Sequence, residues 1–267
     1  MSCYHNIIIS SIIISLLFPS VSSSCSSILP SSMTTITLTE NQAIAAVDEN
    51  LQLYLYKNLS SAAFSTFNLK EIVKGGSVPE KIRLTSSKNY LVLYQEGTPE
   101  IYTFLFNEIT KALEYEGVFE SHSDPILDFK ASASDNKIFS SDGRSILLWD
   151  IKERRILLKI EVPNVRSLQL MRGRLLAINT KINLIDLRRN RIQTFEQIGF
   201  PLNTTRITSI ILRRSLVIAQ GKNIKIINME NFELVENVEL EENIIKAGLD
   251  PRSKSLFVLT SAGTLVY

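Results

Sequence analysis

Few residues of this chain could do acid–base chemistry. Histidine is the usual acid–base residue near neutral pH, and the chain has two, His5 and His122. A nucleophilic Ser–His–Asp arrangement would have to use His122. The sequence holds no glycine-rich phosphate turn before a helix and no metal-ligand spacing. The pair Glu241 and Glu242 sits in a polar connection, where we expect it to be solvated. We therefore predict no enzyme, no cofactor and no small-molecule substrate, with carboxylate-based hydrolysis as the catalytic alternative.

The segment around His122 reads as four short strands. Residues 121–160 contain the apolar runs ILDFKA, KIFSS, SILLWDI and RILLKI, separated by turn residues. His122 precedes the first run, Ser140 and Ser141 lie on the second, and Trp149 lies on the third. Asp142 begins the turn between the second and third runs. The pattern predicts one four-stranded antiparallel unit.

Similar units recur along the chain. Each has an apolar strand, a turn and a third strand, and no helical period is sustained. The third strands end at Tyr56, Phe104, Asp150, Asp186, Asn228 and Tyr267. A period of about 40 residues with four strands per unit is typical of propeller blades. Six units fit, and the last stops after its third strand. Its missing outer strand comes from residues 1–32 or a partner, or the ring stays open, or the chain is truncated.

The unit from His122 to Ile160 resembles one blade of the WD-repeat family. In that family a His, a Ser or Thr, a turn Asp and a Trp form a hydrogen-bonded network; His122, Ser140 or Ser141, Asp142 and Trp149 match them. Asp142 lies one residue early, because Gly143 occupies the usual place, so the network is expected to be partial. The resemblance implies an all-β, WD-repeat-like β-propeller of about six four-stranded blades over residues 33–267, the last incomplete or closed by another segment.

Residues 1–32 differ from the rest and are not expected to belong to the core. They contain a twelve-residue apolar run and a Ser-rich stretch, too short to span a bilayer comfortably. A secretory signal usually begins with Lys or Arg, but neither residue precedes the apolar run. We favour Met33 as the true start; a signal or anchor segment and a strand of the fold are the alternatives. Both cysteines, Cys3 and Cys25, lie in this leader, which suits an intracellular protein.

Positive charge is concentrated in one sector of the sequence. Residues 150–225 hold sixteen Lys or Arg against five Asp or Glu, although the whole chain carries a net charge of only +2. Such segregation favours an acidic or phosphorylated protein segment as the partner, and exposed strands that are merely solvated are the structural alternative. The predicted partner-binding residues are Arg188, Arg189, Arg191, Arg206, Arg213 and Arg214. We do not expect nucleic acid, because the sector lacks interleaved aromatic residues.

Three finer resemblances fall in this sector. The run Asp186-Leu187-Arg188, followed by Thr205 and Arg206, looks like the mitotic-checkpoint and mRNA-export branch of WD-repeat proteins, which would imply binding short motifs across the top face. The Asp186 and Arg188 spacing also resembles the motif of cullin-ligase substrate receptors, although such residues often serve only local pairing. The Arg-Arg pairs in 187–190 and 212–215 resemble the Arg-Arg pair of phosphoinositide-binding propellers, but the Gly that follows the pair in those proteins is absent here.

Together these observations predict a non-enzymatic scaffold that works inside a multiprotein complex. The expected location is the cytoplasm or nucleus, or the secretory pathway if residues 1–32 are a genuine signal. A binder of phosphoinositides or anionic membranes and a cullin-ligase substrate receptor are the competing functions.

Overall fold

The part of the chain that the structure describes is built from antiparallel β-sheets. This computed structural model describes residues 33–38, 44–57, 63–73, 82–87, 90–95, 97–107, 110, 112–132, 136–171, 173–189, 191–195, 207–212, 214–249, 256–263 and 265–266. Within them six sheets form, five with four strands and one with three, and a single 3-10 turn (η1, Leu69–Glu71) is the sole helical element. The prediction of an all-β chain with repeated sheets is confirmed.

The chain divides into two compact units, Met1–Val162 and Pro163–Tyr267. In the first unit, sheet A comprises β1 (Met33–Leu38), β2 (Ile44–Asp48), β3 (Gln52–Tyr56) and β4 (Ser65–Asn68); sheet B comprises β5 (Ile82–Ser87), β6 (Tyr90–Gln95), β7 (Ile101–Asn107) and β8 (Ala112–Phe119); sheet C comprises β9 (Asp128–Ala131), β10 (Lys137–Ser141), β11 (Ile146–Asp150) and β12 (Arg155–Ile160). In the second unit, sheet D comprises β13 (Ser167–Met171), β14 (Arg174–Ile178), β15 (Ile182–Asp186) and β16 (Arg191–Phe195); sheet E comprises β17 (Thr208–Leu212), β18 (Ser215–Gln220), β19 (Asn223–Asn228) and β20 (Leu234–Glu239); sheet F comprises β21 (Ile244–Leu249), β22 (Leu256–Thr260) and β23 (Leu265–Val266).

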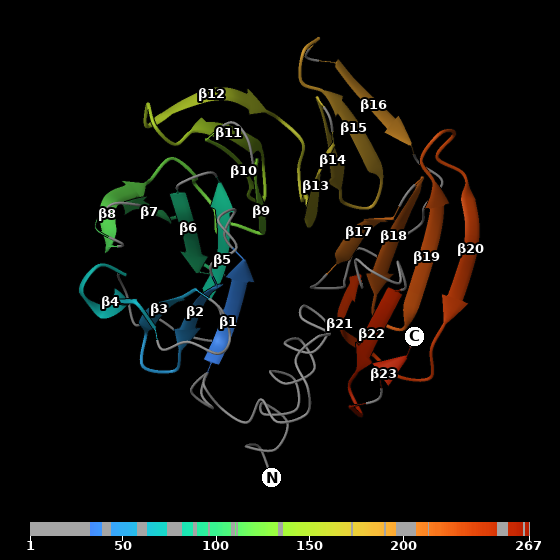
Figure 1. Ribbon diagram of the computed structural model, residues 1–267. Helices are drawn as coiled ribbons and strands as arrows, with labels where there is room; N and C mark the ends of the chain where they lie inside the picture. Colours follow the sequence, from blue (N-terminus) through green and yellow to red (C-terminus); the bar gives the residue numbers. More distant parts are fainter. Residues whose placement is uncertain are drawn as a thin grey trace. The chain divides into compact units, whose positions relative to one another are not determined.

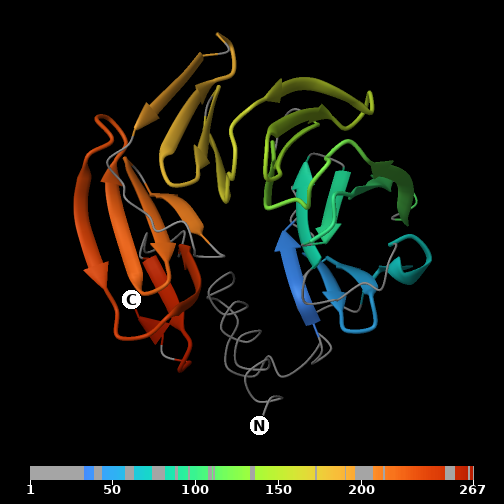
Figure 2. The same ribbon diagram turned by 180° about the vertical axis from the view of Figure 1, so that it is seen from behind.

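Within each unit, successive sheets pack face to face with their first strands adjacent. Strands β1, β5 and β9 are neighbours in the first unit, as are β13, β17 and β21 in the second, and each meander leads away to an outer fourth strand where one is present (Figure 1). The reverse view shows the same sequence of strands in each unit (Figure 2). This arrangement buries both faces of an inner sheet.

Strand alternation explains how two faces are buried at once. In β6, Leu91 and Leu93 belong to the core shared with sheet A, whereas Val92 and Tyr94 belong to the core shared with sheet C. Adjacent strand residues point to opposite faces, so a strand buried on both sides carries apolar residues in succession rather than in alternation. The uninterrupted apolar runs of the sequence have this cause.

Four of the six predicted third strands end where the sequence placed them and one is longer, while the end predicted at Tyr267 lies outside the described residues. Strands β3, β11, β15 and β19 end at the predicted residues, while β7 continues to Asn107, three residues beyond the predicted end at Phe104. The sixth sheet has three strands among the described residues, as predicted. The leader 1–32 lies outside the described residues, and a single domain over 33–267 stays a prediction.

A bulge in β8 couples sheet B to sheet C. Thr103 pairs with Gly117 and Phe104 with Tyr115, which leaves Glu116 as an extra residue in β8. The Arg154 guanidinium donates from Nη1 to the Glu116 carbonyl (2.8 Å) and from Nη2 to the Val118 carbonyl (3.2 Å). Gly117 has φ +133°, and a Cβ there would lie 2.6 Å from Arg154 Nη2, so only glycine suits this site.

We expect Arg154→Met to lower the free energy of unfolding by about 1–2 kcal/mol, because charge-assisted hydrogen bonds and the contact of Arg154 with the Phe119 ring (5.1 Å) are lost. Urea titration measures the change. The matched control is Arg155→Met, at an exposed neighbour, which should stay within about 0.5 kcal/mol of the parent. Equal losses in both variants would contradict the coupling.

Candidate functional site

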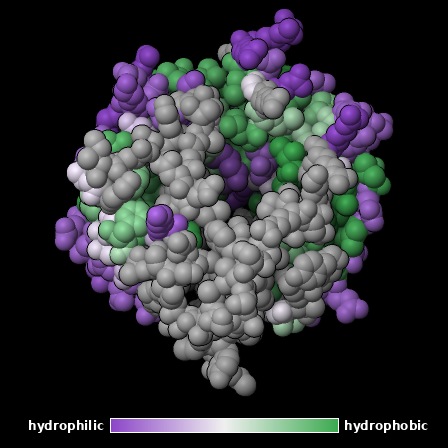
Figure 3. All heavy atoms as spheres, in the orientation of Figure 1, coloured by the Kyte–Doolittle hydropathy of each residue, from purple (hydrophilic) through white to green (hydrophobic). Residues whose placement is uncertain are grey.

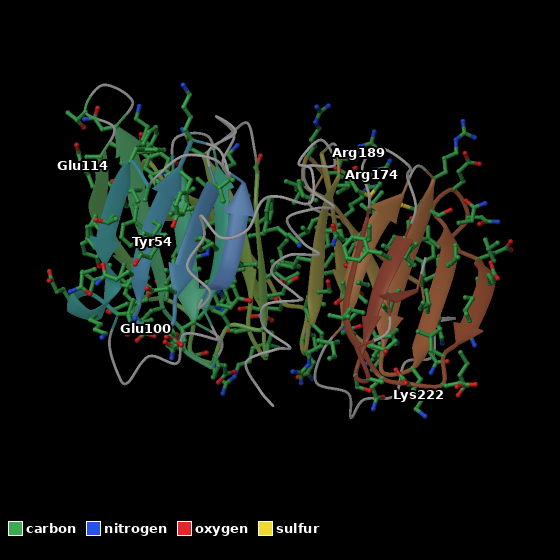
Figure 4. The ribbon with its side chains drawn as sticks, turned by 60° about the horizontal axis from the view of Figure 1, so that its bottom comes forward. Tyr54, Glu100, Glu114, Arg174, Arg189 and Lys222 are labelled. Atoms are coloured by element: carbon green, nitrogen blue, oxygen red, sulfur yellow. The ribbon has the colours of Figure 1, made fainter. Side chains whose placement is uncertain are left out.

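Four arginines gather at one end of sheet D. Arg174 begins β14 and pairs across the sheet with Asp186, which pairs in turn with Arg191 at the start of β16. Arg188 and Arg189 lie in the turn between β15 and β16. We call Arg174, Arg188, Arg189 and Arg191 the arginine end of sheet D. Figure 4 shows Arg174 and Arg189 together at one end of the second unit and Lys222 at the other.

The carboxylate of Asp186 is committed to its own turn. Its Oδ1 accepts hydrogen bonds from the backbone N–H groups of Arg188 (2.9 Å) and Arg189 (3.0 Å). The Arg189 N–H is the largest cause of the lowered pKa of Asp186; the Arg188 N–H and the charges of Arg189 and Arg174 act in the same direction, against a smaller effect of burial. One anion therefore stands among four cations.

The four arginines are exposed and form no ion pair within the part of the chain that the structure describes. Residues 163–195 contain seven Lys or Arg and one Asp or Glu, Asp186 itself. Hydrophilic residues project where β15 turns into β16, at the top edge of Figure 3. The arginine end is thus a solvated concentration of positive charge that an external anion can approach.

The other predicted basic residues have different surroundings. Arg214 lies in the turn before β18, and its Nη1 forms a 2.9 Å ion pair with Glu230, which reduces its availability. Arg206 and Arg213 lie outside the described residues. Arg174 was missing from the predicted set, because its place beside Asp186 follows from the register of β14 with β15. Pairing the start of the strand at Arg174 with the end of the next strand at Asp186 would have been the signal.

The second group of predicted residues forms a hydrogen-bonded chain inside sheet C. Trp149 Nε1 donates to Ser140 Oγ (2.7 Å), Ser140 Oγ lies 2.6 Å from His122 Nε2, and His122 Nδ1 lies 2.9 Å from Asp142 Oδ2. Asp142 Oδ1 accepts from the backbone N–H groups of Arg144 and Ser145. The early position of Asp142 does not keep it out of this network. Of the two candidate serines, Ser140 takes part.

The donors and acceptors define one protonation state. Because the ionised Asp142 carboxylate can only accept, His122 Nδ1–H donates to it. Nε2 of the neutral imidazole then accepts from the Ser140 hydroxyl, whose oxygen accepts from Trp149 Nε1–H. Burial lowers the pKa of His122 by more than Asp142 raises it, so the imidazole is neutral. Burial alone would raise the pKa of Asp142, but the N–H bonds from Arg144, Ser145 and His122 outweigh it and lower that pKa.

This chain of groups resembles a nucleophilic triad in its order of atoms, yet its surroundings suit stability. Ser140 is 0% exposed, and its oxygen accepts from Trp149. A nucleophile needs a position within reach of the reacting atom. The buried hydroxyl has none, so the network ties together the loop before β9, strands β10 and β11, and the turn between them.

The corresponding positions of sheets D and E carry apolar side chains. Counting from the open end of each hairpin, Ala177 and Ile218 occupy the place of Ser140, and Ile185 and Ile227 occupy the place of Trp149. Replacing both partners of a buried hydrogen bond by apolar groups is nearly neutral. The polar network is therefore one of two ways in which this chain fills the same sheet interior.

No protein-family model matches the chain, and none of the curated proteins does. In the described ranges, no helix has the length and apolar character to cross a membrane. Nor do three or more His, Cys, Asp or Glu residues among those described come together as metal ligands.

We expect Ser140→Ala to lower the free energy of unfolding by about 1–3 kcal/mol for each of the two groups it deprives of a partner, Trp149 Nε1–H and His122 Nε2. Ser140→Thr retains the hydroxyl and is the control, with a smaller loss. Urea titrations followed by Trp149 fluorescence measure both. Equal stability of the alanine variant and the parent would contradict the network.

The lowered pKa of His122 predicts acid sensitivity. A histidine whose folded pKa is depressed contributes stability that is complete above its unfolded pKa of about 6.5 and lost as pH falls through that value. We expect the free energy of unfolding to fall from pH 7.5 to 5.5, by at most about 1.4 kcal/mol per pH unit for one proton. His122→Gln should flatten this slope. In NMR spectra the His122 imidazole should titrate at a lower pH in the folded chain than in the unfolded chain.

Proposed function

We propose that this chain is a non-enzymatic WD-repeat β-propeller scaffold that docks an acidic or phosphorylated segment of a partner protein at the arginine end of sheet D. The observation that carries the proposal is the group of four exposed arginines, Arg174, Arg188, Arg189 and Arg191. The single carboxylate among them, that of Asp186, already accepts hydrogen bonds from its own turn. Binding rather than chemistry is proposed because the acid–base residue His122 is buried in a network that holds sheet C together.

The propeller architecture is supported by repeated sheets and by the contents of sheet C. Successive sheets of each unit pack on one another with first strands adjacent, and the inner sheet packs through both faces, as blades do. The network of His122, Ser140, Asp142 and Trp149 has the composition and connections of the WD-repeat network. A closed ring of about six blades is part of the proposal.

Guanidinium groups suit phosphorylated and carboxylate-rich segments in particular. A planar guanidinium donates two parallel hydrogen bonds to a carboxylate or phosphate, which gives geometric selectivity as well as charge. The arginine end offers four such groups, on one turn and two strand starts of one sheet. Exposed pairs contribute little singly, about 0.2–1 kcal/mol, so several together are needed for useful affinity.

The alternative function, binding of an anionic membrane, would use the same four arginines of sheet D. The cullin-receptor alternative uses the spacing of Asp186 and Arg188, but the Asp186 carboxylate already caps its turn. The same capping recurs at Asn107, Asp150 and Asn228, each of which accepts a backbone N–H two or three residues ahead. A turn-forming role therefore accounts for Asp186.

We expect the triple variant Arg188→Glu, Arg189→Glu and Arg191→Glu to weaken binding of a peptide rich in glutamate and phosphoserine at least about tenfold, or about 1.4 kcal/mol. Fluorescence anisotropy at about 50 and 300 mM NaCl measures it, and parent binding should weaken with salt because exposed charges are screened. An unphosphorylated glutamine version of the peptide should not bind.

The matched control reverses an equal charge elsewhere. Lys152, Arg155 and Lys159 are exposed in and before β12, and their triple change to Glu should leave the affinity within about twofold of the parent. Equal losses in both variants, or none in either, would remove the arginine end as the docking site. Flotation of the parent with phosphoinositide vesicles, together with failure of the peptide to bind, would favour the membrane alternative instead.

A further inference from the structure

The outer edge of sheet D differs from that of its neighbour in the second unit. In sheet E, the pairing of β19 with β20 shifts between Ile226 and Ile227, which leaves Val235 as an extra residue in the outer strand. In sheet D, β16 pairs with β15 residue for residue along its whole length. Bulges twist an edge and discourage further strand pairing. The edge of β16 has no such protection.

The edge of β16 is accessible along its length. Residues 191–194 are all exposed, and no fifth strand of the described chain pairs with β16. In an antiparallel edge strand, alternate residues direct their N–H and C=O groups away from the sheet. These groups can accept a further strand in regular register.

The side chains of β16 define what kind of strand fits. Ile192 is 44% exposed, and Arg191 and Gln193 point to the opposite face because strand residues alternate. Arg188 and Arg189 add positive charge at the end where β16 begins. A docked strand would place apolar side chains beside Ile192 and acidic side chains beside Arg191.

We propose that β16 accepts an extended segment of a partner protein as a fifth strand of sheet D, and that this segment alternates apolar and acidic residues. The inference rests on the proposed function, since it gives the docking mode at the arginine end. Main-chain hydrogen bonds supply the affinity in such strand addition, and alternate side chains supply the selectivity.

Two N-methylated peptides test the mode with the full, unaltered chain. The parent probe is a capped heptapeptide of alternating valine and glutamate. One analogue carries N-methyl groups on its valines and the other on its glutamates, so that each blocks one edge of the peptide without changing charge or side chains. Because one edge faces β16, we expect one analogue to bind at least about tenfold more weakly and the other to stay within about twofold. Bound parent peptide should protect amides of β16 from hydrogen exchange and leave those of β20 unchanged.

The outcomes separate the mode from the function. If both analogues bind as the parent does, and the change of Arg188, Arg189 and Arg191 to Glu still abolishes binding, strand addition is wrong and the arginine end remains the site. If both analogues lose affinity, the peptide does not pair through one edge, and if protection appears in β20, it does not pair with β16. Either result rejects strand addition at the β16 edge. If neither the alternating peptide nor the phosphorylated peptide binds, both proposals fail.

Discussion

Burial of the middle strands on both faces is the constraint on which this structure depends. Leu216 and Ile218 of β18 pack toward sheet D, while Val217 and Ala219 of the same strand pack toward sheet F. A strand in this position favours apolar residues on both faces, because a buried polar group without a hydrogen bond is costly. Turns, strand ends and outer strands escape this constraint, and the arginine end of sheet D combines all three.

The polar network of sheet C obeys the same constraint in a different way. Ser140, with 0% exposure, is acceptable inside the sheet because its hydroxyl both donates to His122 and accepts from Trp149. At the same register in sheet D, Ala177 and Ile185 need no partners at all. A half-complete version would leave a buried donor or acceptor unpaired, so the intermediate combinations are the costly ones. Hence a strong sequence signature in one sheet is compatible with its complete absence from the next.

The sequence predicted the strands well because two simple signals coincide in them. Apolar runs mark the buried middle strands, and Asp or Asn at the ends of β11, β15 and β19 marks the capped turns that follow. Strand β7 extends past Phe104 because the bulge at Glu116 lies opposite its middle and the ladder continues to Asn107. Which charges pair was not predictable in this way: Arg214 and Glu230 lie in different turns, and Arg174 meets Asp186 only through the strand register.

The outer strand of sheet D lacks the register shift found in three other sheets, as does that of sheet A. In sheets B, C and E the register shift falls beside Phe104, Trp149 or Ile227, so the outer strand gains a residue at the same point. In sheet D, Ile185 pairs directly with Ile192, and the outer strand stays regular. The interior of sheet D holds Leu176 and Ile185 beside the buried Asn183, whose side-chain amide donates to the Ala177 carbonyl (3.2 Å). Arg174 and Arg189 lower the pKa of Asp186, but none of the four arginines forms an ion pair within the described chain, so an external anion can bind them.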